Sequence, residues 1–254
     1  VTGASPTVRH RGEIETADAS PLASPLLVTL VTSFALSGFS GLALEVVWTR
    51  ALALYMGSSV YTFSAVLLAV LIGIALGSVV VAWVAPRRKI TLSWLAGAQF
   101  AAGACTLALA LFYNSLALVF AYLVTGYSKT YPLLLTLEVL AIVGCLLPPT
   151  LFSGATFPIL SRIYVRRQEA LSLGVGYLYA INTVGCILGA FLSGFVLIPH
   201  IGLRATVMLC ASLYVIAGAA VLLNGRGLAR VVGALSLPAL VTALFLLPPW
   251  RANL

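Results

Sequence analysis

Long apolar stretches separated by short polar connections run along most of the chain. Seven of them follow a polar N-terminal segment, and a helix of about 20 residues crosses the hydrocarbon of a bilayer. The pattern predicts an all-α fold, a polytopic helical membrane bundle of about seven transmembrane helices, in a domain over residues 25–250. The spans are predicted near residues 26–50, 59–85, 91–113, 132–165, 174–198, 203–223 and 231–248.

Two apolar stretches depart from a simple span. Residues 132–165 would reach roughly 50 Å as one straight helix. Pro148 and Pro149, near the middle of this stretch, predict a kink or a helix break, because proline lacks the N–H that a helix interior needs. Residues 114–123 are too short to cross, so we expect them to extend the third span or to lie along the membrane interface.

The two ends of the chain differ from its apolar middle. Residues 1–24 are rich in Ser, Thr, Ala, Pro and charged residues, which predicts a disordered or extended polar tail on the cytoplasmic side rather than a signal peptide. Residues 251–254 are interpreted as a tail or as the junction to a further domain.

The composition excludes a soluble globular domain. Apolar residues make up 61% of the chain and charged residues 8%, against about 45–50% and about 25% in ordinary soluble domains. The net charge of +8 is not arranged as a basic stripe with interleaved aromatic residues, so no nucleic-acid partner is expected. The expected surroundings are the lipid bilayer and protein partners within it.

The basic residues predict the orientation of the bundle. Lys and Arg are enriched in cytoplasmic connections, and in the predicted topology ten of the 14 fall on the side of the N-terminus. The N-terminus is therefore expected to be cytoplasmic, in a bacterial inner membrane. The ten are Arg9, Arg11, Arg87, Arg88, Lys89, Arg162, Arg166, Arg167, Arg226 and Arg230, and the other four are Arg50, Lys129, Arg204 and Arg251.

The residues that bind metals or cofactors are scattered. The four cysteines lie singly in different apolar runs, without CxxC spacing, and His10 and His200 share no helix face with a carboxylate. We expect no metal and no cofactor. Nucleophile motifs and phosphate-binding glycine loops are also missing from the sequence, so no catalytic residue is expected.

Small residues recur at four-residue spacing inside several spans. This spacing lets helix backbones approach closely in lipid, where van der Waals contact drives helix association. Helix packing is the interpretation favoured over a transport pathway. The predicted packing positions are Gly73, Gly77, Gly185, Gly189, Ser193 and Gly194.

Glu45 and Glu138 are acids inside apolar runs. A carboxylate at the bilayer centre costs about 2.5 to 3.5 kcal/mol on insertion scales, so each needs a partner, a proton or water. Arg50 and Asn182 are candidate partners; Arg50, five residues after Glu45, lies on a neighbouring helix face and could instead reach another helix. The two hypotheses are acids that fix the register of the helices and a proton or cation relay.

Three segments carry a more specific signal: SGFSGLALEVVWTRALALYMGSS at 37–59, SGATFPILSRIYVRR at 153–167 and LGVGYLYAINTVGCILGAFLSGFVLIPHIG at 173–202. Together they resemble the membrane domain of bacterial proteins described as fused major-facilitator/spermidine synthase. The resemblance extends over most of residues 30–249. It implies that any aminopropyltransferase chemistry belongs to a soluble domain that follows the helices, and that the C-terminal LPPWRANL resembles the junction to that domain.

The sequence leaves more than one function open. The favoured prediction is a membrane scaffold or anchor subunit that acts through helix packing in a larger assembly, such as a respiratory or photosynthetic complex, without catalysis. The alternatives are a transporter-like module for a small cationic substrate such as a polyamine, with Glu45 and Glu138 as counter-charges, and the membrane part of a polyamine aminopropyltransferase.

Overall fold

A computed structural model describes residues 24–57, 60–165, 171–225 and 228–246. The regular structure within these ranges is entirely helical, which confirms the predicted all-α fold. The predicted tails, residues 1–24 and 251–254, lie outside the described residues except for Ser24, which is the first residue of α1. The helices are α1 (Ser24–Met56), α2 (Val60–Val84), α3 (Leu92–Leu111), α4 (Tyr113–Tyr127), α5 (Tyr131–Val165), α6 (Leu171–Leu192), the π-helical segment η1 (Ser193–Leu197), α7 (Ile198–Leu223) and α8 (Leu228–Leu246).

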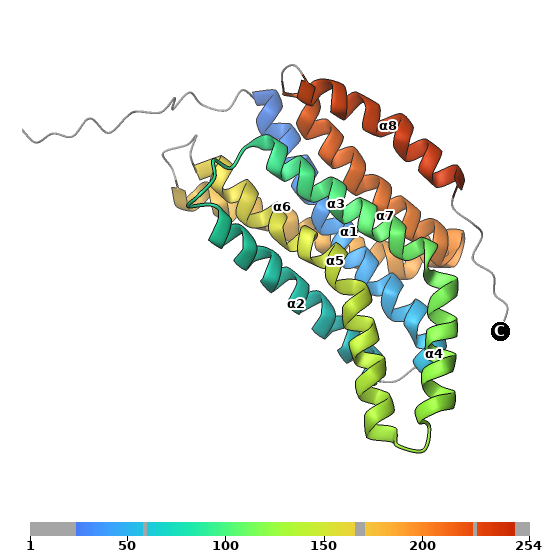
Figure 1. The fold of residues 1–254 in the computed structure, drawn as a ribbon. Coiled ribbons are helices and arrows are strands. Elements are labelled where there is room, and N and C mark those ends of the chain that lie inside the picture. Colours follow the sequence, from blue (N-terminus) through green and yellow to red (C-terminus); the bar gives the residue numbers. More distant parts are fainter. Residues whose placement is uncertain (1–23, 58–59, 166–170, 226–227, 247–254) are drawn as a thin grey trace, which may run out of the picture.

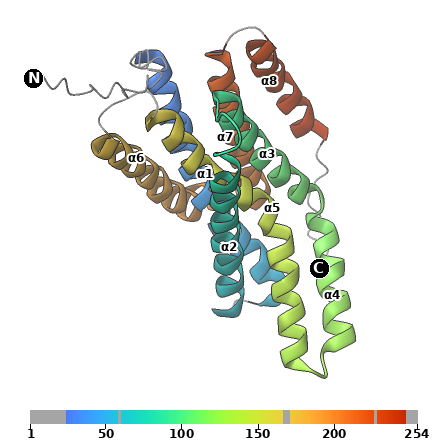
Figure 2. The same cartoon turned by 60° about the vertical axis from the view of Figure 1, so that its left-hand side comes forward.

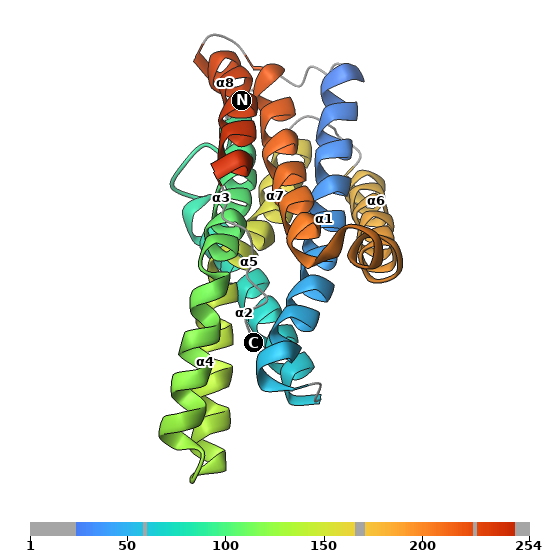
Figure 3. The ribbon, with the colours of Figure 1, turned by 90° about the vertical axis from the view of Figure 1, so that its right-hand side faces the viewer.

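Successive long helices alternate in direction (Figures 1 and 3). The start of α1 lies at the same end of the bundle as the α2–α3 and α7–α8 connections, whereas the α4–α5 connection lies at the opposite end. The basic residues Arg87, Arg88 and Lys89 follow α2 and therefore lie at the first end, and Lys129 lies at the other. Which end faces the cytoplasm stays a prediction.

Five stretches within the described residues are long and apolar enough to cross a membrane. One of them, Val175–Leu223, contains two helices, because Gly202 adopts a left-handed backbone conformation with φ of 81° that an α-helix does not allow. The chain reverses there, and α6 and α7 pass through the bundle in opposite directions (Figure 3). The bundle is compatible with an integral membrane protein.

Helix α4 is a separate element. Phe112, with φ of −83° and ψ of 1°, interrupts the helical run between α3 and α4. The 15 residues of α4 rise only about 22 Å, and the helix continues in the general direction of α3. It packs on the first half of α5, and the two form a hairpin that extends beyond the α1–α2 connection (Figure 2).

Prolines shape α5 without ending it. The helix continues from Tyr131 to Val165 with Pro148, Pro149 and Pro158 inside it, and its axis changes direction near its middle (Figure 1). A proline removes one backbone hydrogen bond and pushes its ring against the preceding turn, which bends a helix. The outcome at Pro148 and Pro149 is a bend in a continuous helix rather than a break.

Glycines allow two helix pairs to cross closely. On α2, Gly73 and Gly77 face α5, and a Cβ added to Gly77 would lie 2.9 Å from the backbone nitrogen of Ala155. On α6, Gly185 and Gly189 face α1, and a Cβ added to Gly189 would lie 2.8 Å from the carbonyl carbon of Phe39. Both distances are shorter than real Cβ contacts, so α2 is held on α5 and α6 on α1 by backbone proximity.

Candidate functional site

A cavity of about 260 Å³ lies among the described helices, between the α1–α6 pair and the α2–α5 pair. Helices α3 and α7 contribute one residue each, Thr106 and Tyr214. The cavity follows from the two glycine-mediated pairs, because each pair is tightly closed on itself while small side chains face the space between the pairs. A Cβ added to Gly41 of α1 would meet only Tyr214 Oη at 3.6 Å and Ser153 Oγ at 3.8 Å.

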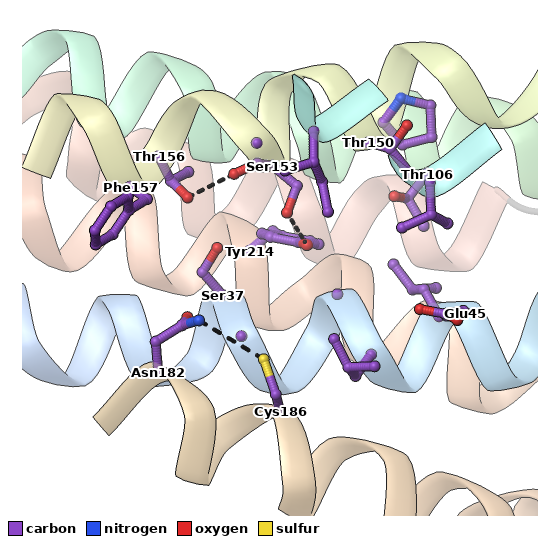
Figure 4. A pocket seen from close by; sticks show the side chains of 18 of the residues that line it. Ser37, Glu45, Thr106, Thr150, Ser153, Thr156, Phe157, Asn182, Cys186 and Tyr214 are labelled. Carbon is purple, nitrogen blue, oxygen red and sulfur yellow. Dashed lines mark hydrogen bonds between the residues drawn. The ribbon is translucent and has the colours of Figure 1, made fainter. Parts of the chain in front are cut away.

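Glu45 stands at one end of the cavity (Figure 4). Glu45 is half-buried on α1. Its carboxylate has no ion pair or hydrogen bond to any other residue that the structure describes. Among the cavity-lining residues, all of which are described, Glu45 is the one with a formal charge at neutral pH. The cavity therefore carries one acid among neutral groups, and this acid has no ion pair within the part of the chain that the structure describes.

The opposite end of the cavity is lined by neutral polar side chains. Figure 4 shows Asn182 and Ser37 on one side and Thr156 on the other. Asn182 Nδ2 donates to Cys186 Sγ over 3.7 Å, and a thiol sulfur is a weak acceptor. Among the described residues this is the one hydrogen bond of the Asn182 side chain, so the amide retains both donor and acceptor capacity.

One hydrogen bond joins the walls in the middle of the cavity. Ser153 Oγ of α5 and Tyr214 Oη of α7 lie 2.9 Å apart, and either hydroxyl can be the donor. Tyr214 is 2% exposed, so its hydroxyl reaches the cavity from inside the bundle. This pair links α5 to α7 at the cavity.

Three aromatic rings border the cavity near its Asn182 end. Phe34 stacks on Phe157 with centroids 5.8 Å apart, and Phe157 meets Tyr179 edge-on at 6.2 Å. Phe157 is 36% and Tyr179 62% exposed, so the rings extend from the cavity to the outer surface of the bundle between α5 and α6. In a membrane this surface would face lipid.

Arg50 contacts a different helix from the one that carries Glu45. Its Nη2 donates to the carbonyl oxygen of Gly194 over 3.3 Å. The N–H of Ile198 donates to Ser193 in the π-helical pattern, and Pro199 has no N–H, so the Gly194 carbonyl has no helical donor. The guanidinium of Arg50 supplies the hydrogen-bond donor that the Gly194 carbonyl lacks within the helix.

Glu138 lies apart from the cavity. It is 8% exposed on the face of α5 that carries Leu134, Ile142 and Leu146 at four-residue intervals. The structure thus brings Glu45 and Asn182 to one cavity and leaves Glu138 and Arg50 outside its lining.

The remaining predicted positions have different surroundings. Pro149 lines the cavity, whereas Pro148 on the neighbouring face is exposed. Ser193 is buried and its Oγ donates to Ala190 within the same turn. A Cβ on Gly194 would make an ordinary contact of 3.7 Å with Val46. The described residues contain no group of three His, Cys, Asp or Glu placed to hold a metal ion.

Sequence analysis missed Ser37, Ser153, Tyr214 and the three aromatic rings. A signal for the α1 part exists in the sequence, because residues 37, 41 and 45 follow one another at four-residue intervals and so share one helix face. The residues of α5, α6 and α7 join the site only through the packing of helices distant in sequence.

Comparisons with the models of known families, with curated proteins and with solved structures found no match to this chain. The resemblance to the fused major-facilitator/spermidine synthase membrane domain therefore stays a prediction.

Proposed function

We propose that this chain is a transporter-like membrane module that binds a small organic cation in the cavity between α1, α2, α5 and α6. The observation that carries the proposal is the carboxylate of Glu45, which lines the cavity without an ion pair among the described residues. Ionisable side chains inside membrane helices are costly and mark substrate or ion pathways. A bound cation would supply the missing counter-charge.

The surroundings of Glu45 suit an organic cation. Trp48 follows Glu45 by three residues on α1, so both side chains lie on one helix face, and both line the cavity. An indole ring attracts an ammonium group through its π-electrons, by about 0.5 to 2 kcal/mol depending on desolvation. Val66 and Val70 of α2 add an apolar wall, which suits a cation with carbon substituents better than a hydrated metal ion.

The scaffold function that the sequence favours draws no comparable support from a particular contact. The exposed apolar residues of α6, such as Ile187 and Phe191, suit lipid and a protein partner equally well. The bacterial inner membrane remains part of the proposal, and so does the cytoplasmic N-terminus, which the excess of Lys and Arg in the connections on that side supports.

Uptake of tetramethylammonium into liposomes containing the full chain tests the proposal. This cation is permanently charged and does not cross lipid unaided, so uptake above that of protein-free liposomes reports passage through the protein. We expect such uptake from the unchanged chain. Glu45→Gln should reduce the initial rate by about tenfold or more, because the neutral amide no longer offsets the cost of bringing a charge into the membrane.

The matched control for this experiment is Glu138→Gln, which removes the other acid that lies inside an apolar helix, on α5, without touching the cavity lining. Its uptake rate should stay within about twofold of the unchanged chain. Unchanged-chain liposomes that take up no more cation than protein-free ones would contradict transport. Equal rates for the unchanged chain and Glu45→Gln would contradict the role of Glu45.

A further inference from the structure

The two ends of the cavity offer different chemistry to a bound molecule. One end holds the Glu45 carboxylate, and the other holds the Asn182 amide with the hydroxyls of Ser37 and Thr156. No second acid lines the cavity, all of whose lining residues are described. A cation charged at both ends would therefore place one charge against neutral groups, which is costly away from water.

The spacing along α1 gives the distance between these ends. A Cβ added to Gly38 would touch the Asn182 side chain, with 3.0 Å to its Cγ, so Gly38 marks the position of the amide on α1. Glu45 follows seven residues later in the helix, which corresponds to an axial separation of about 10 Å. The occupant must be an elongated molecule if it is to reach both groups.

The stretch between the two ends is largely apolar, apart from the Ser153 and Tyr214 hydroxyls, which are hydrogen-bonded to each other. Gly41 leaves the α1 wall without a side chain there, and Leu42 of α1 with Val70 and Ile74 of α2 add apolar lining. The volume of about 260 Å³ lies near the lower end of the roughly 300–1,000 Å³ typical of ligand pockets. An aliphatic chain fits such a space better than a ring system with polar substituents.

We infer that the occupant is an elongated, singly charged amine, with its ammonium at Glu45, an aliphatic middle and an uncharged hydrogen-bonding group at Asn182. This inference rests on the proposed function and adds the substrate class. It separates such monoamines from polyamines, which carry a positive charge at each end and find one carboxylate in this cavity.

Three linear amines of equal carbon number test the inference: octylamine, 8-aminooctanol and 1,8-diaminooctane. Their binding to the full chain in lipid nanodiscs is measured at neutral pH, where the amines are protonated, and binding to empty nanodiscs is subtracted. We expect 8-aminooctanol to bind about tenfold more tightly than 1,8-diaminooctane, because the diamine buries an unpaired charge. Octylamine should bind more weakly than 8-aminooctanol because it leaves the Asn182 amide unpaired.

Two variants and one control assign these preferences to particular residues. Asn182→Ala should remove the preference for 8-aminooctanol over octylamine, because the amide that octylamine leaves unpaired is then absent. Thr183→Ala, the control, should keep the preference, because the Thr183 hydroxyl bonds the Tyr179 carbonyl on the exposed side of α6. Glu45→Gln should weaken the binding of all three amines.

The outcomes separate the inference from the proposed function. Diamine binding as tight as that of 8-aminooctanol, with both lost in Glu45→Gln, would overturn the substrate class and leave the cation site standing. A preference that survives Asn182→Ala would overturn the role of Asn182. If none of the amines binds more tightly to the unchanged chain than to Glu45→Gln, the proposed function and this inference both fail.

Discussion

Ser78 of α2 donates a hydrogen bond of 3.3 Å from its hydroxyl to the carbonyl oxygen of Gly154 on α5. Pro158, four residues after Gly154, has no N–H, so this carbonyl lacks its helical donor. The two helices therefore share a polar contact at a place where their backbones pass close together, since a Cβ on Gly154 would meet the backbone of Ile74. The bond ties the α2–α5 pair together beside the cavity.

Ser78→Ala is expected to destabilise the bundle by about 0.5 to 2 kcal/mol, because it strands a carbonyl away from water. Unfolding by a denaturing detergent in mixed micelles measures the free energy. Ser161→Ala is the control, since the Ser161 hydroxyl bonds carbonyls of its own helix, Phe157 and Pro158. Equal stability of both variants would show that the Ser78 bond contributes nothing measurable.

Gly77→Ala should destabilise the bundle more strongly than an alanine at an open position of α5. The added methyl would press on the Leu151 carbonyl, and backbone atoms cannot move aside without separating α2 from α5. We expect a loss of about 1 to 3 kcal/mol. Gly144→Ala meets nothing within 4 Å and should be neutral or slightly stabilising. Detergent unfolding of both variants measures the difference, and similar values would argue against close packing at Gly77.

Gly41→Leu should block the cavity while the fold persists. A Cβ at this position makes only ordinary contacts, and leucine favours a helix over glycine by somewhat less than about 1 kcal/mol. Amine binding should fall by about tenfold or more as the side chain fills the space. Gly97→Leu, at a position with nothing within 4 Å, should leave binding unchanged. Full amine binding by a folded Gly41→Leu variant would place the binding site elsewhere.

Lys89 and Lys129 report the orientation of the bundle, because both are exposed and lie at opposite ends. A cysteine replacing Lys89 should react with an impermeant thiol reagent only from the cytoplasmic side, and one replacing Lys129 only from the outer side. Labelling is compared with the parent chain, which carries four native cysteines. The reverse pattern would invert the predicted topology.

Much of the fold could be predicted because hydrophobicity and length decide what can cross a membrane. The connection between the fifth and sixth predicted spans, 199–202, contains Gly202, whose positive φ separates the two helices. By contrast, the outcome at Pro148 and Pro149 depended on neighbouring helices. Proline weakens a helix locally, but whether the helix breaks or bends follows from what supports it on either side.

The candidate site was less accessible to sequence reasoning. The position of Glu45 inside an apolar run identified it as a candidate, because a membrane acid is costly wherever it lies. Its relation to Asn182, more than 130 residues later in the sequence, depends on the crossing of α1 and α6, which no local pattern encodes. The Arg50 contact with Gly194 likewise depends on the π-helical segment before Pro199.

The most direct test of the cation site is calorimetric titration of the full chain in nanodiscs with 8-aminooctanol, repeated with Glu45→Gln and Glu138→Gln. The account predicts one binding site in the unchanged chain. It further predicts binding weakened by about tenfold or more in Glu45→Gln, and affinity within about twofold of the unchanged chain in Glu138→Gln. Equal affinity of Glu45→Gln and the unchanged chain would contradict the account.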